Sequence, residues 1–234
     1  MKKYLGTMIS CISLSLALLL FFSCATRKPQ DLSDFESAPM YGMVYDYENQ
    51  ACADTLIIIN EERETRSDIN GRFIITDLLR GNHQITAKKE GYETISFSLY
   101  FTNRSQVLYI RMISFYQLLK NIENEIEAQN WYEVELLMAR AEKIKTDDPI
   151  QQYLKAVYMN QTGQPENAIE ILLNIIDQNY EEPIIYLTLS DIYYYKMNNI
   201  PEALKYMEDY LRLESDRVVQ KRYDSMKSEI TVQD

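Results

Sequence analysis

The sequence predicts a multidomain α and β protein, in which a small all-β sandwich precedes a superhelix of α-helical hairpins. Apolar residues recur at every second position between Met40 and Ile113, and at helical spacing from Ser114 onward. The helical part also repeats itself at an interval of about 34 residues. An uncharged, mostly apolar segment lies before both modules, close to the N-terminus. Such a segment is typical of an export signal and not of a folded domain.

The N-terminal segment has the layout of a signal peptide. Lys2 and Lys3 form a short positive region, and residues 5–22 carry no charge. The segment ends in Leu-Phe-Phe-Ser-Cys at residues 20–24, which resembles the lipobox of bacterial lipoproteins. That resemblance implies cleavage before Cys24 and attachment of a lipid, such as diacylglycerol or palmitate, at this residue.

An uncleaved membrane anchor is the alternative for the same segment, because about 20 uncharged residues can span a bilayer. Both interpretations leave the remainder of the chain outside the cytoplasm, since the two lysines stay inside. The lipoprotein interpretation predicts a lipid-anchored protein of the cell envelope. An Asp directly after the lipidated cysteine would resemble an inner-membrane retention signal, but this chain has Ala25 at that position. We therefore expect the outer membrane, on either its periplasmic or its surface face.

Charge divides the rest of the chain into two modules. The formal net charge is −11, and it becomes more negative when the signal peptide is removed. This excludes nucleic acid as an expected partner, because nucleic acid binding requires basic patches. Between residues 40 and 113 ten acids face eight bases, whereas residues 114–213 hold seventeen acids and eight bases. The predicted organisation is a signal peptide (1–23), a tether (24–39), a β-sandwich (40–113), three helical repeats (114–213), and a capping helix with a tail (214–234).

Six short strands are predicted in the first module. The clearest alternates polar and apolar residues over 94–101, as a half-buried strand does. Turn residues separate the strands, and Asn70-Gly71 predicts a hairpin that needs positive φ. The remaining strands are predicted at 41–47, 54–60, 71–76, 83–89 and 106–112.

Four short motifs in this module occur in the order of a known family. They are Gly-Met-Val-Tyr-Asp at 42–46, Ser-Asp-Ile-Asn-Gly-Arg-Phe at 67–73, Leu-Leu-Arg-Gly at 78–81 and Lys-Glu-Gly-Tyr at 89–92. Together they resemble the carboxypeptidase regulatory-like domain, a small transthyretin-like (prealbumin-like) sandwich. The resemblance implies an accessory or recognition module without catalytic activity.

Helical hairpins follow, and three segments occupy equivalent places in them. Val134, Ala168 and Ala203 are separated by 34 and 35 residues. This interval, and the placing of Gly163 and Asn198 in the turns between paired helices, resembles tetratricopeptide repeats. The resemblance implies three stacked hairpins, about the minimum for a stable array, followed by a capping helix.

Catalytic residue types are scarce. His83 is the only histidine and lies in a predicted strand, where we expect it to be partly exposed. A zinc peptidase site needs two histidines and a carboxylate, so we expect no metal, no cofactor and no enzyme activity. Cys52 is the only cysteine after Cys24, and we expect it to be a small buried apolar residue.

A partner-binding groove is predicted on the first helices of the repeats. In such arrays these helices line a concave surface. Tyrosine, of which the chain has nineteen, suits such a surface because it combines a large contact area with a polar tip. The positions that the repeat resemblance assigns to the groove are Glu123, Glu127, Tyr153, Asn160, Gln161, Thr188, Tyr195 and Lys196.

Two hypotheses for function follow. In the first, the repeats bind an unidentified envelope protein as a non-enzymatic scaffold, with no small-molecule substrate. In the second, the sandwich binds cell-wall glycan or peptidoglycan, and the repeats serve oligomerisation. Tyr45, Tyr47 and Tyr100 are the aromatic residues from which a glycan platform would be built. Capture of the isolated 40–113 fragment by cell-wall polysaccharide would separate the two hypotheses.

Overall fold

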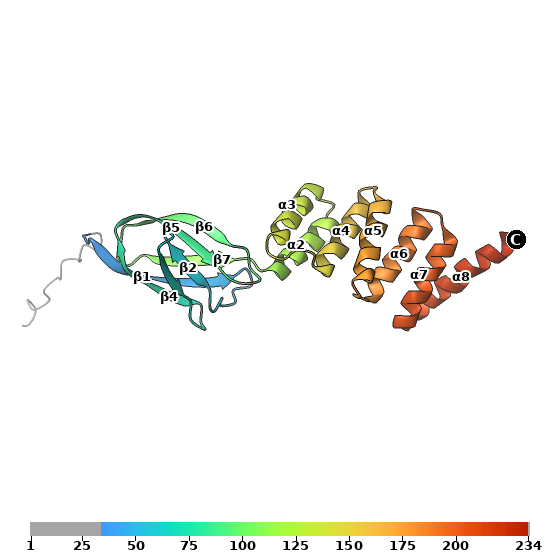
Figure 1. Ribbon diagram of the computed structural model, residues 1–234, viewed down its shortest axis with the longest axis horizontal. Coiled ribbons are helices and arrows are strands. Elements are labelled where there is room, and N and C mark those ends of the chain that lie inside the picture. Colours follow the sequence, from blue (N-terminus) through green and yellow to red (C-terminus); the bar gives the residue numbers. More distant parts are fainter. Residues whose placement is uncertain (1–33, 234) are drawn as a thin grey trace, which may run out of the picture.

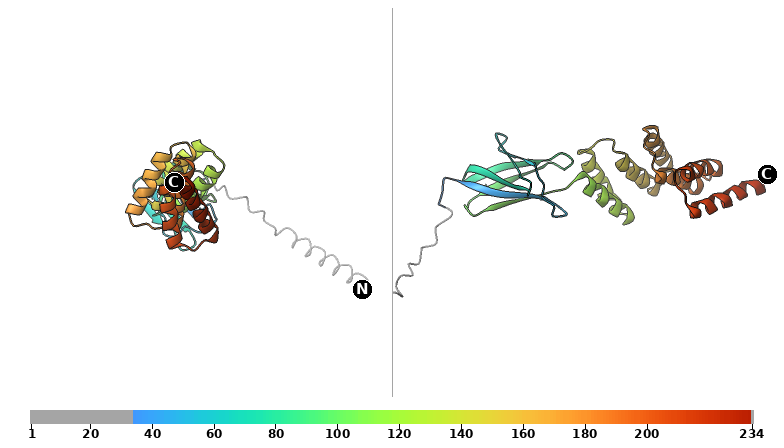
Figure 2. Two further views of the ribbon diagram at one scale, coloured as in Figure 1. Left: turned by 90° about the vertical axis from the view of Figure 1, so that its right-hand side faces the viewer. Right: turned by 90° about the horizontal axis from the view of Figure 1, so that it is seen from below.

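The computed structural model describes residues 34–233, and side chains up to Ser228. In this part seven strands precede seven helices, and the two sets lie end to end in an elongated molecule (Figure 1). The right-hand view of Figure 2 shows the same order from below, with the helical hairpins following one another along the long axis. The predicted fold class, a sandwich followed by helical hairpins, is therefore confirmed. The predicted signal peptide, Cys24 and the tether as far as residue 33 lie outside the described residues.

The sandwich has a three-stranded and a four-stranded sheet. The first has the order β4-β1-β7 and the second β3-β2-β5-β6. In the first sheet the central strand β1 runs parallel to β7 and antiparallel to β4. The strands are β1 (Ser37–Asp46), β2 (Leu56–Ile59), β3 (Arg63–Arg66), β4 (Arg72–Leu79), β5 (Gly81–Lys88), β6 (Ile95–Phe101) and β7 (Val107–Met112).

Strict alternation builds the sandwich core. Along β1 every second side chain points inward, so Met40 and Val44 are fully buried while Tyr41 between them is 54% exposed. Inward residues of the two sheets form one cluster that contains aliphatic and phenylalanine side chains, among them Phe101. Because the side-chain period of a strand is two, this pattern also fixes the register of each strand.

The sandwich begins earlier than residue 40. Strand β1 starts at Ser37, and Phe35 is buried with its ring centroid 5.1 Å from that of Phe101. The last residues of the predicted tether are therefore part of the fold. Strand β3 was not predicted either, because its sequence Arg-Glu-Thr-Arg has no apolar residue.

The Asn70-Gly71 turn exists, but the predicted hairpin is wrong. The turn joins β3 of one sheet to β4 of the other, so its two strands are not neighbours in a sheet. Gly71 has φ +75°, and a Cβ added there would lie 2.3 Å from the carbonyl oxygen of Val44. Asp68 Oδ1 accepts hydrogen bonds from the backbone N–H groups of Asn70 and Arg72, each at 2.8 Å. The motif is therefore a tight crossover between the two sheets.

Two residues singled out in the sequence are structural parts of the sandwich. Cys52 is 1% exposed, as predicted, and burial raises the pKa of its thiol. His83 is buried at 8% exposure, so its predicted partial exposure is wrong. Its Nε2 lies 2.8 Å from the carbonyl oxygen of Leu79, and its Nδ1 lies 3.1 Å from Asn60 Nδ2. Both ring nitrogens are thus used in holding neighbouring turns together.

Three helical hairpins and a final helix form the second module. Pro149, Pro165 and Pro183 each stand in the first turn of a helix, where the missing N–H does no harm. Ser114 and Gln117 form a reciprocal capping box at the first helix. The helices are α2 (Phe115–Glu127), α3 (Trp131–Glu142), α4 (Pro149–Gln161), α5 (Pro165–Asp177), α6 (Pro183–Tyr195), α7 (Ile200–Leu213) and α8 (Arg217–Gln233).

The repeat interval read from the sequence corresponds to equivalent positions in the structure. Val134, Ala168 and Ala203 lie on α3, α5 and α7, and each is 0% exposed. Gly163 and Asn198 have positive φ in the turns within the second and third hairpins. Among the described residues, no helix combines the length and the apolar character needed to cross a bilayer.

The two modules meet through main-chain and side-chain contacts. Phe115 N–H donates to the carbonyl of Gly91 at 2.8 Å, and Glu93 N–H donates to the carbonyl of Ile113 at 3.0 Å. Arg140 on α3 makes a two-pronged contact with the Glu93 carboxylate, at 3.0 and 2.8 Å. The first hairpin is therefore bonded to the loop that precedes β6.

Candidate functional site

The first helices of the three hairpins, α2, α4 and α6, carry the predicted groove residues. We call the surface made by these residues the inner face. Glu123 and Glu127 lie on α2 and Tyr153, Asn160 and Gln161 on α4. Thr188 and Tyr195 lie on α6, and Lys196 caps that helix. All eight are exposed or partly exposed, so each is available on the surface of the helix to which the repeat pattern assigned it.

Tyr153 on α4 is linked to α6 by a hydrogen bond and to Glu123 of α2 by charge. Its hydroxyl lies 3.2 Å from Thr188 Oγ1. The Thr188 hydroxyl donates its one proton to the carbonyl of Ile184 at 2.8 Å, so Tyr153 is the donor to Thr188. Burial raises the pKa of Tyr153, the hydrogen bond with Thr188 lowers it in part, and the carboxylates of Glu123 and Asp191 raise it. Residues from α2, α4 and α6 therefore act on one phenol.

Asn160, the last residue but one of α4, adds an unusual feature. Its Oδ1 is buried, and no described residue donates a hydrogen bond to it. An unsatisfied buried acceptor costs about 1–3 kcal/mol. Gln161 beside it is exposed. The structure thus places an unpaired carboxamide oxygen within the predicted set.

Tyr195 differs from the rest of the set because α8 reaches it. The Arg222 guanidinium lies 5.3 Å from the centroid of the Tyr195 ring and 6.0 Å from that of Tyr194. The same guanidinium forms an ion pair with Asp191. Sequence reasoning treated α8 only as a cap and missed this contact. Tyr195 remains 66% exposed beside this contact, so the α6 end of the inner face stays open to solvent.

The predicted glycan platform is not one surface. Tyr45 lies on β1 and Tyr100 on β6, which belong to different sheets, and both side chains point away from the core. The two rings therefore face opposite sides of the sandwich. On the side of Tyr45, Arg111 lies 5.1 and 5.3 Å from the ring centroids of Tyr45 and Tyr47. Tyr109 stands edge-on to Tyr45 at 6.4 Å, so these rings do not form a flat platform.

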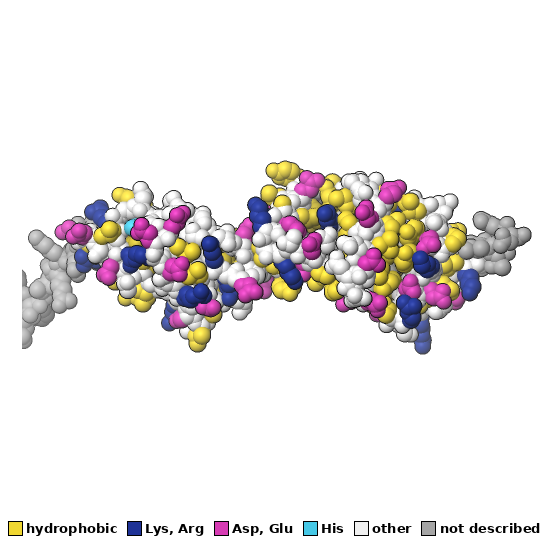
Figure 3. Space-filling model, viewed as in Figure 1, with side chains coloured by type: hydrophobic (Ala, Val, Ile, Leu, Met, Phe, Trp, Pro, Cys, Tyr) yellow, Lys and Arg dark blue, Asp and Glu magenta, His cyan; other side chains and the backbone are white. Residues whose placement is uncertain are grey.

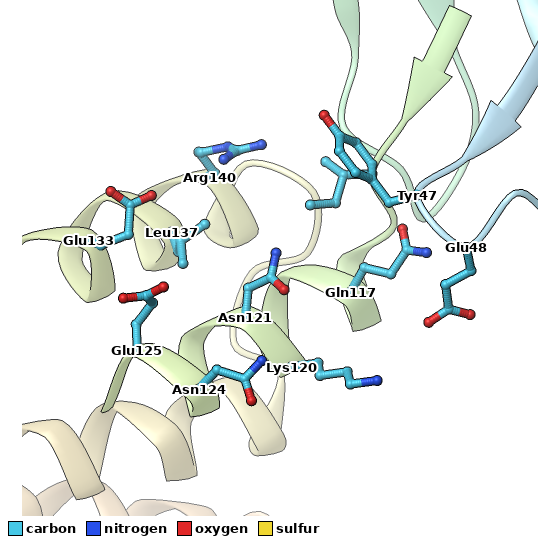
Figure 4. Close-up of a pocket in the computed structure, with 11 residues that line it drawn as sticks. Tyr47, Glu48, Gln117, Lys120, Asn121, Asn124, Glu125, Glu133, Leu137 and Arg140 are labelled. Carbon is cyan, nitrogen blue, oxygen red and sulfur yellow. The ribbon is translucent and has the colours of Figure 1, made fainter. Parts of the chain in front are cut away.

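A cavity that sequence reasoning did not find lies where the modules meet. It has a volume of about 500 Å³ and is open to solvent. Figure 4 shows the sandwich contributing Tyr47 and Glu48 on one side and α2 and α3 contributing the other walls. We call it the junction pocket. Its eleven lining residues are Tyr47, Glu48, Ile113, Gln117, Lys120, Asn121, Asn124, Glu125, Glu133, Leu137 and Arg140.

Comparison with known proteins places the chain in no family. No family model matches it, and no curated protein matches it. Among solved structures, the type III secretion chaperone SycD of Yersinia enterocolitica, in complex with a peptide of the translocator YopD, is 14% identical, with a TM-score of 0.43. That likeness covers 50% of this chain and 92% of the chaperone.

Other solved structures are similar over about a third of this chain. A 3-chlorocatechol 1,2-dioxygenase from Rhodococcus opacus is 16% identical over 35% of this chain and 62% of its own, with a TM-score of 0.27. A streptococcal ancillary pilin is 14% identical over 35% of this chain and 33% of its own, with a TM-score of 0.29. At these TM-scores none of the likenesses carries an argument about function.

Proposed function

We propose that this protein is a non-enzymatic binding module whose inner face holds a segment of a partner protein. The observation that carries the proposal is that residues of α2 and α6 both act on Tyr153 of α4. Tyrosine with a polar tip at the surface is enriched at protein interfaces. The exposed Glu123 carboxylate would accept hydrogen bonds from a bound chain, and the partly exposed Asn160 would donate through its amide nitrogen. The sandwich would orient this face relative to the envelope.

The proposal includes membrane attachment, and this part rests on the sequence alone. The lipobox resemblance at Cys24 supports a lipid anchor, and the following residues up to Phe35 would serve as a short tether. Attachment at the outer membrane would keep the inner face within reach of an envelope protein. Cys24→Ala should abolish metabolic labelling with palmitate and leave unprocessed precursor or released protein. Unchanged labelling and processing would favour the uncleaved anchor.

Partner binding is tested by crosslinking in cells followed by purification of the full chain. Charge reversal of Glu123 and Glu127 to Lys should abolish recovery of the partner, because both are exposed on the inner face. Glu166→Lys with Glu170→Lys on α5 is the matched control, since both acids are exposed on a helix outside the inner face. Equal recovery with both variants would contradict the proposed site.

Tyr153→Phe refines the same experiment. The substitution keeps the ring and removes the hydroxyl that bonds to Thr188. A measurable loss of partner recovery would assign a role to the phenol oxygen. Recovery at the level of the unmodified protein would limit the site to its charged residues.

A further inference from the structure

The junction pocket is distinct from the inner face. Gln117, Asn121 and Asn124 line the pocket from α2, whereas Glu123 and Glu127 on the same helix are not among its lining residues. At about 500 Å³, its volume is within the range of sites that bind small molecules. Boundaries between modules are also a common location for such sites. The volume and location of the junction pocket therefore make it a candidate ligand site separate from the inner face.

The walls of the pocket are held in place. Arg140 is fixed by two hydrogen bonds to Glu93, and burial in this pair leaves the two side chains only 32% and 27% exposed. The Glu93 hydrogen bonds raise the pKa of Arg140, so it is charged at any physiological pH. The main-chain hydrogen bonds that Phe115 and Glu93 donate to Gly91 and Ile113 hold the two modules together beside the pocket. A pocket organised before binding loses less entropy when a ligand enters.

Several polar groups on the walls are free to bind. The carboxamides of Asn121 and Asn124 form no hydrogen bond with any other described residue, and each offers donors and an acceptor. Figure 4 shows Asn121 in the middle of the pocket, with Glu125 and Glu133 together at one end. Lys120 extends away from these two acids. Glu125 uses one oxygen to accept from Asn130 at 2.8 Å, and its other oxygen forms no hydrogen bond with a described residue.

Charge and polarity restrict the class of ligand. Glu48, Glu93, Glu125 and Glu133 outnumber Lys120 and Arg140, so the local charge disfavours phosphates and carboxylates. Only Ile113 and Leu137 are aliphatic, so an apolar ligand would leave the many polar groups without partners. What remains is a polar ligand without negative charge that has many donors and acceptors.

We propose that the junction pocket binds a neutral saccharide. Each sugar hydroxyl is both a donor and an acceptor, and neighbouring hydroxyls match the paired polar atoms of a carboxamide or carboxylate. Asn121, Asn124 and Glu133 supply these planar groups. The Tyr47 ring, which is 57% exposed, provides an apolar surface for the C–H face of the sugar, while Ile113 and Leu137 are buried beneath the pocket. The site differs from the surface tyrosine platform expected on the sandwich, because both modules build it.

The test uses the full chain and a panel of uncharged sugars: glucose, N-acetylglucosamine, maltose, cellobiose and chitobiose. Binding is measured by isothermal titration and by saturation-transfer NMR at about 10 mM sugar, where a Kd of about 1 mM gives near saturation. We expect saturable binding of at least one sugar. Asn121→Ala and Asn124→Ala should each weaken it by roughly three- to tenfold, since each removes one or two hydrogen bonds.

Asn174→Ala is the matched control, because Asn174 is an exposed helical asparagine on α5, far from the pocket in sequence. It should leave sugar affinity unchanged, and circular dichroism should show that all three variants are folded. Absence of saturable binding by any sugar in the panel would overturn the proposal. Equal effects of Asn174→Ala and Asn121→Ala would also overturn it.

Two further outcomes separate this site from other possibilities. Binding of a lysine-rich peptide at the pocket, with no sugar bound, would assign the acidic end to a basic segment and overturn the saccharide proposal. The Glu123→Lys and Glu127→Lys variant should bind sugar normally, because it alters only the inner face. Loss of the protein partner with intact sugar binding would show that the two sites are independent.

Discussion

Tyrosine enters the buried core of only one of the two modules. The helical array has exposed tyrosines as well, among them Tyr132 at 78%, but the described part of the sandwich has no tyrosine among its buried residues. In the sandwich Tyr41, Tyr100 and Tyr109 are 54%, 58% and 62% exposed, and phenylalanine fills the core. In the helical array Tyr158, Tyr186, Tyr206 and Tyr210 are all at most 8% exposed. On the side shown in Figure 3, hydrophobic side chains, tyrosine included, gather over the helices and are scattered among charges on the sandwich.

Geometry explains this difference. A strand in a two-layer sandwich has one face in the core and the other in water, so a tyrosine is placed on one side or the other. A helix between two neighbours buries most of its circumference, and a long phenol can lie in the core while its tip reaches the edge. Tyr158 donates to Glu135 and Tyr210 to Asp216 in this manner. The phenol hydroxyls of the array therefore lie at the boundary of its core, whereas the buried hydroxyls of the sandwich, those of Thr55 and Ser67, bond to the backbone carbonyl of Cys52.

The largest loss of stability is expected from removing a large side chain from the sandwich core. Phe101→Ala removes a fully buried ring and should lower the free energy of unfolding of the sandwich by about 3–5 kcal/mol. Tyr100→Ala, its outward neighbour on β6, should change it by less than about 0.5 kcal/mol. Urea unfolding followed by methyl NMR of the sandwich isoleucines measures both values.

The same experiment tests whether the cores are independent. The sandwich core and the helical cores are separate clusters. Fluorescence of Trp131, the chain's one tryptophan, reports on the array. Its urea midpoint should not move in Phe101→Ala, and a parallel shift would show that the modules unfold as one unit.

Alkaline pH should destabilise the helical array more than the sandwich. Burial or acidic neighbours raise the pKa of six tyrosines in the array, but of only one tyrosine, Tyr92, in the sandwich. A pKa raised by folding gives stability that is fully present below the unfolded pKa of about 10 and is lost as pH rises through the folded pKa. The six are Tyr153, Tyr158, Tyr180, Tyr186, Tyr193 and Tyr210.

The measurement is the urea midpoint of each module between pH 8 and pH 11, with Trp131 and the sandwich methyl groups as probes. The midpoint of the array should fall more steeply above about pH 10. Cys52, whose pKa is raised by burial, loses its proton in the sandwich over an overlapping range, and Cys52→Ser removes that contribution. If the urea midpoint of the sandwich in the Cys52→Ser variant falls at a lower pH than that of the array, the prediction is wrong.

The smallest effect is expected at the contact between the modules. Arg140→Gln breaks the pair with Glu93, which is partly exposed, and should cost about 0.2–1 kcal/mol. Arg66→Gln is the control, because its pair with Asp54 is 57% and 78% exposed and should contribute nothing measurable. Faster amide exchange around Gly91 and Phe115 in Arg140→Gln alone would show that the pair stiffens the junction.

Much of the fold could be predicted because both modules have short-range patterns. The period of two over 94–101 and the interval between Val134, Ala168 and Ala203 can be read from the order of residues alone, without knowing which segments pack together. Strand β3 was missed because it gains its place from pairing with β2, not from its own apolar residues. The hairpin at Gly71 was wrong for the same reason, since a turn residue indicates a reversal but not which strands pair afterwards.

The candidate site shows the same division. Repeat geometry assigned Tyr153 and Thr188 to one surface, and the structure bonds them. The Arg222 contact with Tyr195 depends on how α8 packs, and the pocket near Arg140 depends on how two modules meet. No local pattern contains either contact, because the residues involved are brought together by chain segments far apart in the sequence.

The sequence by itself determined the two modules, their order, the buried face of strands with a clear alternation such as β6, and the repeat that sets the inner face. These follow from side-chain periods of 2 and 3.6 and from a recurring small residue, all of which are local properties. Only the tertiary structure decided which strands are neighbours, which tyrosines α8 contacts and where a pocket opens. Those depend on long-range packing, in which a residue's surroundings come from segments that its own neighbours in the chain do not specify.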